Sequence, residues 1–144
     1  MPDLKLKAAQ KIVATALKEA RDRTFKPLAV AVYDARGALK AFGAEEGTSL
    51  KRGEIAMGKA LGALALGVPS RAIGKMAAER PHFVAAASHV VGGMLVPVAG
   101  GVLIRDAKGA LVGAVGVSGD TSDNDEIAAV AGIEAAGLSA ETGA

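Results

Sequence analysis

Cysteine and tryptophan are absent from this chain of 144 residues, and aromatic residues are few, with one tyrosine and three phenylalanines. Without cysteine the protein can have no disulfide, no thiol nucleophile and no thiolate-held metal. Single-stranded nucleic acids stack on aromatic side chains and contact massed basic residues. The basic residues here number 17 against 15 acidic ones and are scattered. We therefore expect no nucleic-acid partner.

A long uninterrupted hydrophobic run is also missing. The longest weakly polar stretch, residues 85–104, is broken by His89, Pro97 and two Gly-Gly pairs, which is unlike a membrane-spanning helix. The first residues, MPDLKLKAAQ, are charged and amphipathic and have no apolar signal-peptide core. Together with the chain length, these features predict a single domain over residues 1–144 that is cytoplasmic and has no membrane partner.

Small apolar residues dominate what is present. Hydrophobic residues make up 51% of the chain, and glycine occupies 19 positions. The core must therefore be built from Ala, Val, Leu and Ile, and its helices and strands must approach one another closely. Because surfaces of small residues often continue into subunit contacts, we expect a homo-oligomer.

Hydrophobic periodicity and turn residues predict an α+β fold. Apolar residues spaced three and four apart indicate helices, and short apolar runs beside turn signals indicate strands. Tight hairpins imply an antiparallel sheet, and long apolar helices should cover a face of it. We predict helices at residues 4–23, 50–66, 69–78, 81–89 and 122–136, strands at 28–33, 38–42, 102–105 and 110–117, and a frayed C-terminal tail.

The segment VGAVGVSGDTSDNDEIAAVAG, residues 112–132, carries the most information. Its first part has the β-branched character of a buried strand. Gly113 and Gly116 remove side chains from the middle of that strand. Glycine at such positions weakens a strand, and it usually means that another group approaches the backbone closely.

The turn after this strand could bind a ligand or simply begin a helix. Backbone amides of residues 118–122 could bind a carboxylate or phosphate. The acidic residues in and after the turn repel anions, so a cation or a lysine fits better. The simplest interpretation is that Ser122, Asp123 or Asp125 caps the next helix.

Residues 100–132 resemble the C-terminal signature of the GlcG/HbpS-like haem-binding family, which includes the C-terminal domain of PduO-type cobalamin adenosyltransferases. The pattern is a Gly-Gly pair, a strand, a charged turn, a glycine-spaced strand ending in Val-Ser-Gly and an Asp-rich helix start. The segment GEIAMGKALGALALGVPS, residues 53–70, is similar to the family's central helix. The resemblance implies a profilin-like antiparallel sheet covered by helices, haem as a ligand, and dimers that assemble into rings or octamers.

One loop departs from the family pattern. Members usually carry Arg-x-Asp-Gly before the central helix, where this chain has Ala44-Glu45-Glu46-Gly47. Glu46 keeps the carboxylate and Gly47 keeps the turn, but alanine replaces the arginine. If that arginine helps to hold an anionic ligand, this protein has a different ligand or none.

Haem needs an axial ligand in an apolar setting, usually His, Met, Tyr or Cys. His82 and His89 are seven residues apart, so on one helix they share a face but cannot both bind one iron. One of them could be the axial ligand, with Met94 nearby. Both could equally be surface residues or hydrogen-bonded residues of a helix. No side chains suggest a separate metal site.

Lys59 stands out because its neighbours on the central helix are alanine, glycine and methionine. A lysine on an apolar face either extends outward to solvent or has a buried carboxylate partner. Glu46, Glu54 or Asp125 could be that partner. Glu46 could also act as an acid or base, with Lys59 holding an anionic substrate.

We predict a small-molecule site between the sheet and the central helix. Glu46 and Lys59 are its candidate catalytic residues, and haem is the ligand that the resemblance implies. An enzyme acting on a small organic acid or amide is the alternative, and an accessory protein without pocket chemistry is a third. The candidate cofactor-binding residues are His82, His89, Gly100, Gly101 and Ser118.

Overall fold

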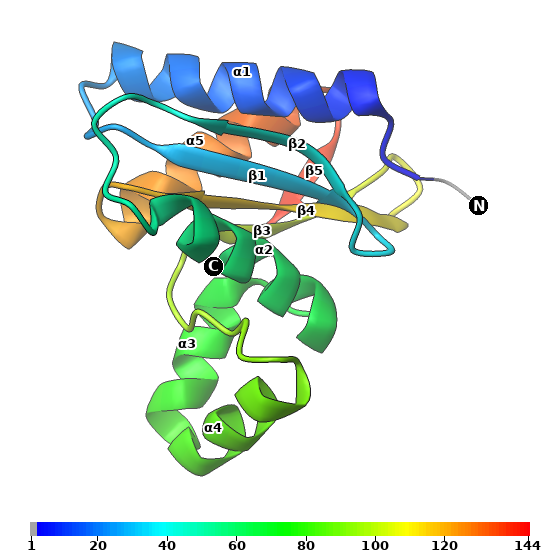
Figure 1. Ribbon diagram of the computed structural model, residues 1–144. Helices are drawn as coiled ribbons and strands as arrows, with labels where there is room; N and C mark the ends of the chain where they lie inside the picture. The colour runs from blue at the N-terminus through cyan, green and yellow to red at the C-terminus, as the bar shows by residue number, and fades with distance from the viewer. Residues whose placement is uncertain (1–2) are drawn as a thin grey trace.

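The computed structural model describes residues 3–144 (Figure 1). Its elements follow one another with short connections, except for the loop between α4 and β3. They are α1 (Leu6–Asp22), β1 (Ala29–Asp34), β2 (Leu39–Ala44), α2 (Arg52–Leu66), α3 (Ser70–Glu79), α4 (Pro81–Val90), β3 (Gly101–Arg105), β4 (Leu111–Ser118), α5 (Ser122–Ala135) and β5 (Ser139–Glu141).

The strands form one antiparallel sheet in the order β2-β1-β4-β3-β5. The two hairpins lie side by side because β1 pairs with β4, from Ala29 opposite Ser118 to Asp34 opposite Gly113. Helices α1 and α5 cover one face of the sheet, and α2 covers the other (Figure 1). The predicted α+β class, an antiparallel sheet covered by helices, is confirmed.

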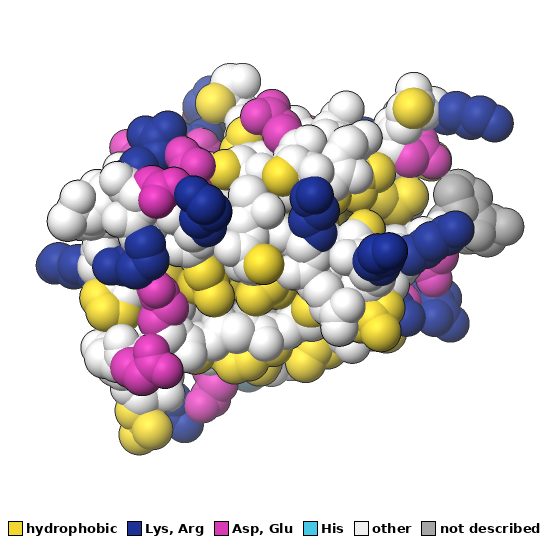
Figure 2. Space-filling view, turned by 90° about the horizontal axis from the view of Figure 1, so that it is seen from above, with side chains coloured by type: hydrophobic (Ala, Val, Ile, Leu, Met, Phe, Trp, Pro, Cys, Tyr) yellow, Lys and Arg dark blue, Asp and Glu magenta, His cyan; other side chains and the backbone are white. Residues whose placement is uncertain are grey.

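The face under α1 and α5 has a core of branched aliphatic side chains. Val30, Val115 and Val117 project from the sheet and meet Ile12 of α1 and Ile133 of α5. These side chains are fully buried. The opposite side of α1 is polar, and lysine and arginine side chains spread along it among acidic ones (Figure 2). This two-sided pattern explains why the spacing of apolar residues predicted α1 well.

The face under α2 is packed through small residues. A Cβ atom at Gly116 of β4 would overlap the carbonyl oxygen of Ala56, and one at Gly101 of β3 would overlap that of Lys59. The backbone of α2 therefore rests directly on two strands, as the glycines in β4 predicted. The expected pocket between the sheet and the central helix is filled by this contact.

Two details at the C-terminal end differ from expectation. The predicted frayed tail contains β5, which pairs with β3 and is held by an ion pair of 2.7 Å between Arg105 and Glu141. The N-cap of α5 is Thr121, whose hydroxyl accepts from the Asn124 N–H at 3.2 Å. Asp125, which was expected as a cap, instead lies buried in the core, where it pairs with a side chain that is described below.

Helices α3 and α4 project from the sheet as an arm (Figure 1). Within the arm α4 packs against α3, and α3 in turn contacts α2 and β3. A single residue, Arg80, ends α3 and begins α4. Across residues 3–144, no helix combines the length and the apolar character that crossing a membrane requires.

Candidate functional site

Lys59 and Asp125 form a buried ion pair between α2 and α5. Their side chains are 2% and 1% exposed, and the amine lies 3.1 Å from a carboxylate oxygen. The same amine donates to the Val117 carbonyl at 2.8 Å, and the second oxygen of Asp125 accepts from the Asp120 N–H at 2.9 Å. Of the three partners considered for Lys59, the structure selects Asp125.

The pair sits in an environment that penalises charge. Burial lowers the pKa of the Lys59 amine, and the attraction of Asp125 opposes that effect. Burial likewise raises the pKa of the Asp125 carboxyl, against the attraction of Lys59. The guanidinium of Arg52 lowers the Lys59 pKa further because it is a like charge. Protein groups satisfy the hydrogen-bonding capacity of both side chains. The role of Lys59 is therefore structural, because its ion pair with Asp125 links α2 to α5.

Three other predicted residues gather around Lys59. Gly100 has a φ of +123°, and a Cβ there would lie 2.7 Å from the Lys59 nitrogen. The Gly101 N–H donates to the Ser70 hydroxyl at 2.6 Å. Ser118 is fully buried and accepts from Arg52 at 3.1 Å. At Gly100 and Gly101, the absence of a side chain leaves space for Lys59 and for the backbone of α2.

Glu46 is not brought to Lys59. It is exposed in the loop between β2 and α2, whereas Lys59 lies in the core. Its neighbour Glu45 is engaged structurally, since it accepts from the Leu28 N–H at 2.8 Å and pairs with Arg21 at 2.9 Å. Beside this loop is a polar hollow of about 200 Å³. Its lining residues are Lys26, Pro27, Gly47, Thr48, Ser49, Arg52 and Gly119.

His82 and His89 lie on α4, away from the sheet. Both are exposed, together with Phe83, Ala86 and Val90. Positions 82, 86 and 89 and positions 83, 86 and 90 are spaced three and four apart, so these five residues share one helix face. We call it the α4 face. It combines two imidazoles with apolar side chains, and Ala86 at its centre presents only a methyl group.

The arm also carries a cation next to the α4 face. The Arg80 guanidinium lies 4.8 Å from the centre of the Phe83 ring. Within residues 3–144, Arg80 has no carboxylate partner within ion-pair distance. Over that same part of the chain, no group of three or more Cys, His, Asp or Glu residues is placed to hold a metal ion.

Two polar side chains that matter to the fold, Asp34 and Arg71, are not among the residues predicted for the site. Buried Asp34 accepts from the Arg36 and Ala38 N–H groups at 2.9 and 3.0 Å and so closes the first hairpin. Arg71 of α3 pairs with Glu126 at 3.1 Å and so ties the arm to α5. The turn residues Asp34-Ala35-Arg36-Gly37, between the first two predicted strands, indicate the first contact, whereas no local signal indicates the second.

Comparison with known proteins gives a consistent result. The family model "Haem degrading protein HbpS-like" matches residues 4–134. A crystal structure of HbpS is 29% identical, covers 94% of this chain and 91% of its own, and has a TM-score of 0.80. A double mutant of Streptomyces reticuli HbpS is 28% identical, with coverage of 94% and 88% and a TM-score of 0.79.

A third solved structure shows the same fold at lower identity. The crystal structure of a PduOC–haem complex is 21% identical, covers 98% of this chain and 100% of its own, and has a TM-score of 0.85. No protein with a curated description matches the sequence.

Proposed function

The chain belongs to the HbpS-like family, and from this membership we propose that it is a haem-binding protein whose haem lies on the α4 face. The family description names haem, and a protein of the same fold forms a haem complex. The observation that carries the proposal is the α4 face itself, where exposed imidazoles stand among exposed apolar side chains.

The residues of the α4 face fit what haem requires. An axial ligand needs an accessible imidazole nitrogen, and the porphyrin needs apolar contact. His82 and His89 supply the nitrogen, while Phe83 and Val90 are 44% and 86% exposed and supply apolar surface. Arg80 supplies a positive charge for a propionate. Bound haem would supply iron for redox or ligand chemistry, and the chain would orient it.

A given chain would offer each iron one histidine. Seven residues along a helix span about 10 Å, which is too far for both imidazoles to reach one iron. A haem on an exposed helix face is covered on one side only. We therefore propose that a second copy of the chain covers the other side, which gives the predicted homo-oligomer, from a dimer to an octamer.

Titration of the purified protein with hemin, followed by its Soret band, tests the proposal. We expect a sharpened and shifted Soret band in the natural protein. The band should be lost in His82→Ala or in His89→Ala, whichever histidine binds the iron, and added imidazole should restore it. Ser88→Ala, on the same helix but outside the α4 face, is the matched control. An unchanged titration in the double variant H82A/H89A overturns the assignment to the α4 face, and no spectral change in the natural protein overturns haem binding altogether.

Two further predictions accompany this proposal. Analytical ultracentrifugation with and without hemin tests the homo-oligomer. A monomer under both conditions contradicts a covering second copy. The cytoplasmic location stays a prediction from the sequence, which cell fractionation tests.

A further inference from the structure

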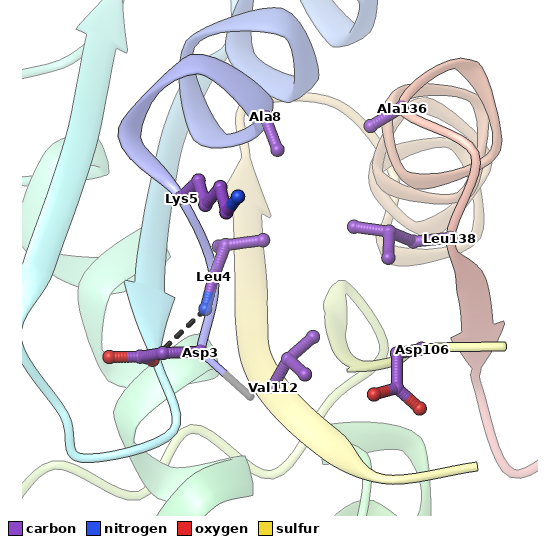
Figure 3. Close-up of a pocket in the computed structure, with 8 residues that line it drawn as sticks. All are labelled: Asp3, Leu4, Lys5, Ala8, Asp106, Val112, Ala136 and Leu138. Atoms are coloured by element: carbon purple, nitrogen blue, oxygen red, sulfur yellow. Dashed lines mark hydrogen bonds between the residues drawn. The ribbon is translucent and has the colours of Figure 1, made fainter. Parts of the chain in front are cut away.

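A second cavity lies on the opposite side of the sheet from α2. It opens between the start of α1, the end of α5 and the hairpin of β3 and β4 (Figure 3). Its volume is about 510 Å³, within the range of about 300–1,000 Å³ typical of small-molecule sites. The residues that line it are Asp3, Leu4, Lys5, Ala8, Asp106, Val112, Ala136 and Leu138.

The walls of this cavity are apolar and belong to the main core. Leu4 and Val112 are only 4% and 3% exposed, and Leu138 packs against the same core. Ala8 of α1 faces Ala136 at the end of α5 (Figure 3). Because both of these side chains are methyl groups, the two helices leave a space between them that larger residues would fill.

One cation stands over the apolar walls. The Lys5 side chain extends over the cavity in Figure 3, and within residues 3–144 no carboxylate lies within ion-pair distance of it. An anionic group placed over the cavity would therefore find an available ammonium group.

The two carboxylates of the lining are engaged elsewhere. Asp3 accepts from the Leu4 N–H at 2.9 Å and lies 3.7 Å from Arg36. Asp106 accepts from the Lys108 and Ala110 N–H groups, both at 2.9 Å, and its carboxylate points away from the cavity (Figure 3). Both carboxylates accept backbone N–H groups of their own segments, so Lys5 is the charged lining side chain that is left to pair with an anionic head group.

We propose that this cavity binds an unbranched medium-chain carboxylate, with the hydrocarbon chain against Leu4, Val112 and Leu138 and the carboxylate at Lys5. The apolar walls would recognise the chain, and the ammonium group would recognise the head. No histidine, methionine or tyrosine lines the cavity, so it offers no side chain of the kind that ligates haem iron. The site is therefore independent of the α4 face and of the proposed function.

Calorimetric titration with hexanoate, octanoate and decanoate tests the apolar part. Burial of one methylene contributes about 0.8 kcal/mol, so each two-carbon extension should tighten binding about 15-fold while room remains. Octylamine should bind at least tenfold more weakly than octanoate because its charge is repelled. Equal affinity across the chain lengths, or octylamine binding as tightly as octanoate, overturns the proposal.

Variants locate the binding in the cavity. Lys5→Gln should weaken octanoate binding about fivefold, the effect of losing one exposed ion pair. Lys7→Gln, an exposed lysine two positions on that does not line the cavity, is the matched control. Ala136→Leu should abolish binding by filling the space. If that variant does not fold, Ala8→Leu fills it from α1, and retained binding in a folded filled variant overturns the site.

Discussion

The two faces of the sheet are packed in opposite ways. Under α1 and α5, branched side chains separate the helices from the sheet, and the close backbone approach is between the two helices, where a Cβ at Gly132 would lie 2.6 Å from the Ile12 carbonyl oxygen. Under α2, glycines and alanines let helix and strand backbones meet, and the charged pair of Lys59 and Asp125 closes the end of the contact. The first face is stabilised by the apolar side-chain area that it buries, whereas the stability of the second depends on the close fit between helix and strand backbones.

This difference determines which changes each face tolerates. Side chains in a core of branched aliphatic residues can shift into the space that a small deletion leaves. The loss of stability therefore grows gradually with the size of the deletion. A contact between two backbones has no side chain that can give way, so even one added carbon must move a helix. The two faces should therefore respond very differently to a change of one carbon.

Adding one carbon at Gly116 should have the largest effect. In Gly116→Ala the new methyl overlaps the Ala56 carbonyl, and α2 must move away from β4. We expect a loss of about 4 kcal/mol or more in the free energy of unfolding, measured by urea denaturation. Gly67→Ala is the control, since its φ is +72° with nothing within 4 Å, and only backbone strain of about 1–2 kcal/mol should appear. Equal losses in both would contradict a backbone contact.

Removing the charge of Lys59 should have the next effect. Lys59→Met leaves Asp125 buried without its cation, and we expect a loss of about 3–5 kcal/mol near neutral pH. Without the cation, burial holds the Asp125 pKa above its unfolded value of 3.8. The folded state then binds a proton that the unfolded state does not, so stability rises as pH falls toward 3.8.

The same denaturation series at several pH values measures this dependence. The double variant K59M/D125L removes both charges and should be flatter with pH and more stable than K59M alone. A loss in K59M that does not change with pH would exclude an orphaned carboxylate as its cause.

Removing one carbon on the opposite face should have the smallest effect. Ile12 is fully buried between α1, α5 and the sheet. Ile12→Val deletes a single methylene, and we expect a loss of about 0.5–1.5 kcal/mol in the free energy of unfolding. If this loss approaches that of Gly116→Ala, the contrast between the two faces is wrong.

Much of the fold could be predicted because its signals are local. The amphipathic spacing of α1 and the turn residues of both hairpins place those elements within a few positions. The short strand β5 could not be predicted, because Ser139, Ala140 and Glu141 have no strand pattern of their own. Pairing with β3 and the contact of Glu141 with Arg105 impose the extended conformation.

The site was harder to predict because its contacts join distant parts of the chain. The sequence indicated that Lys59 needed a partner, but choosing Asp125 required knowing where α5 begins relative to α2. It likewise placed His82 and His89 on a helix but could not show that this helix projects from the sheet. The cavity at Leu4 and Leu138 depends on two ends of the chain meeting.

The joint at Arg80 lies within the arm and separates α4 from α3, while α3 stays in contact with α2, β3 and α5. The Arg80 N–H donates to the Met76 carbonyl at 2.6 Å, and its own carbonyl accepts from the Phe83 N–H at 3.1 Å. One residue thus terminates one helix and starts the next. Because a helix turns about 100° per residue, one residue inserted here would rotate His82 and His89 about the α4 axis by a quarter of a turn or more. A one-residue insertion at this joint therefore changes the direction of the imidazoles without changing the register of any strand.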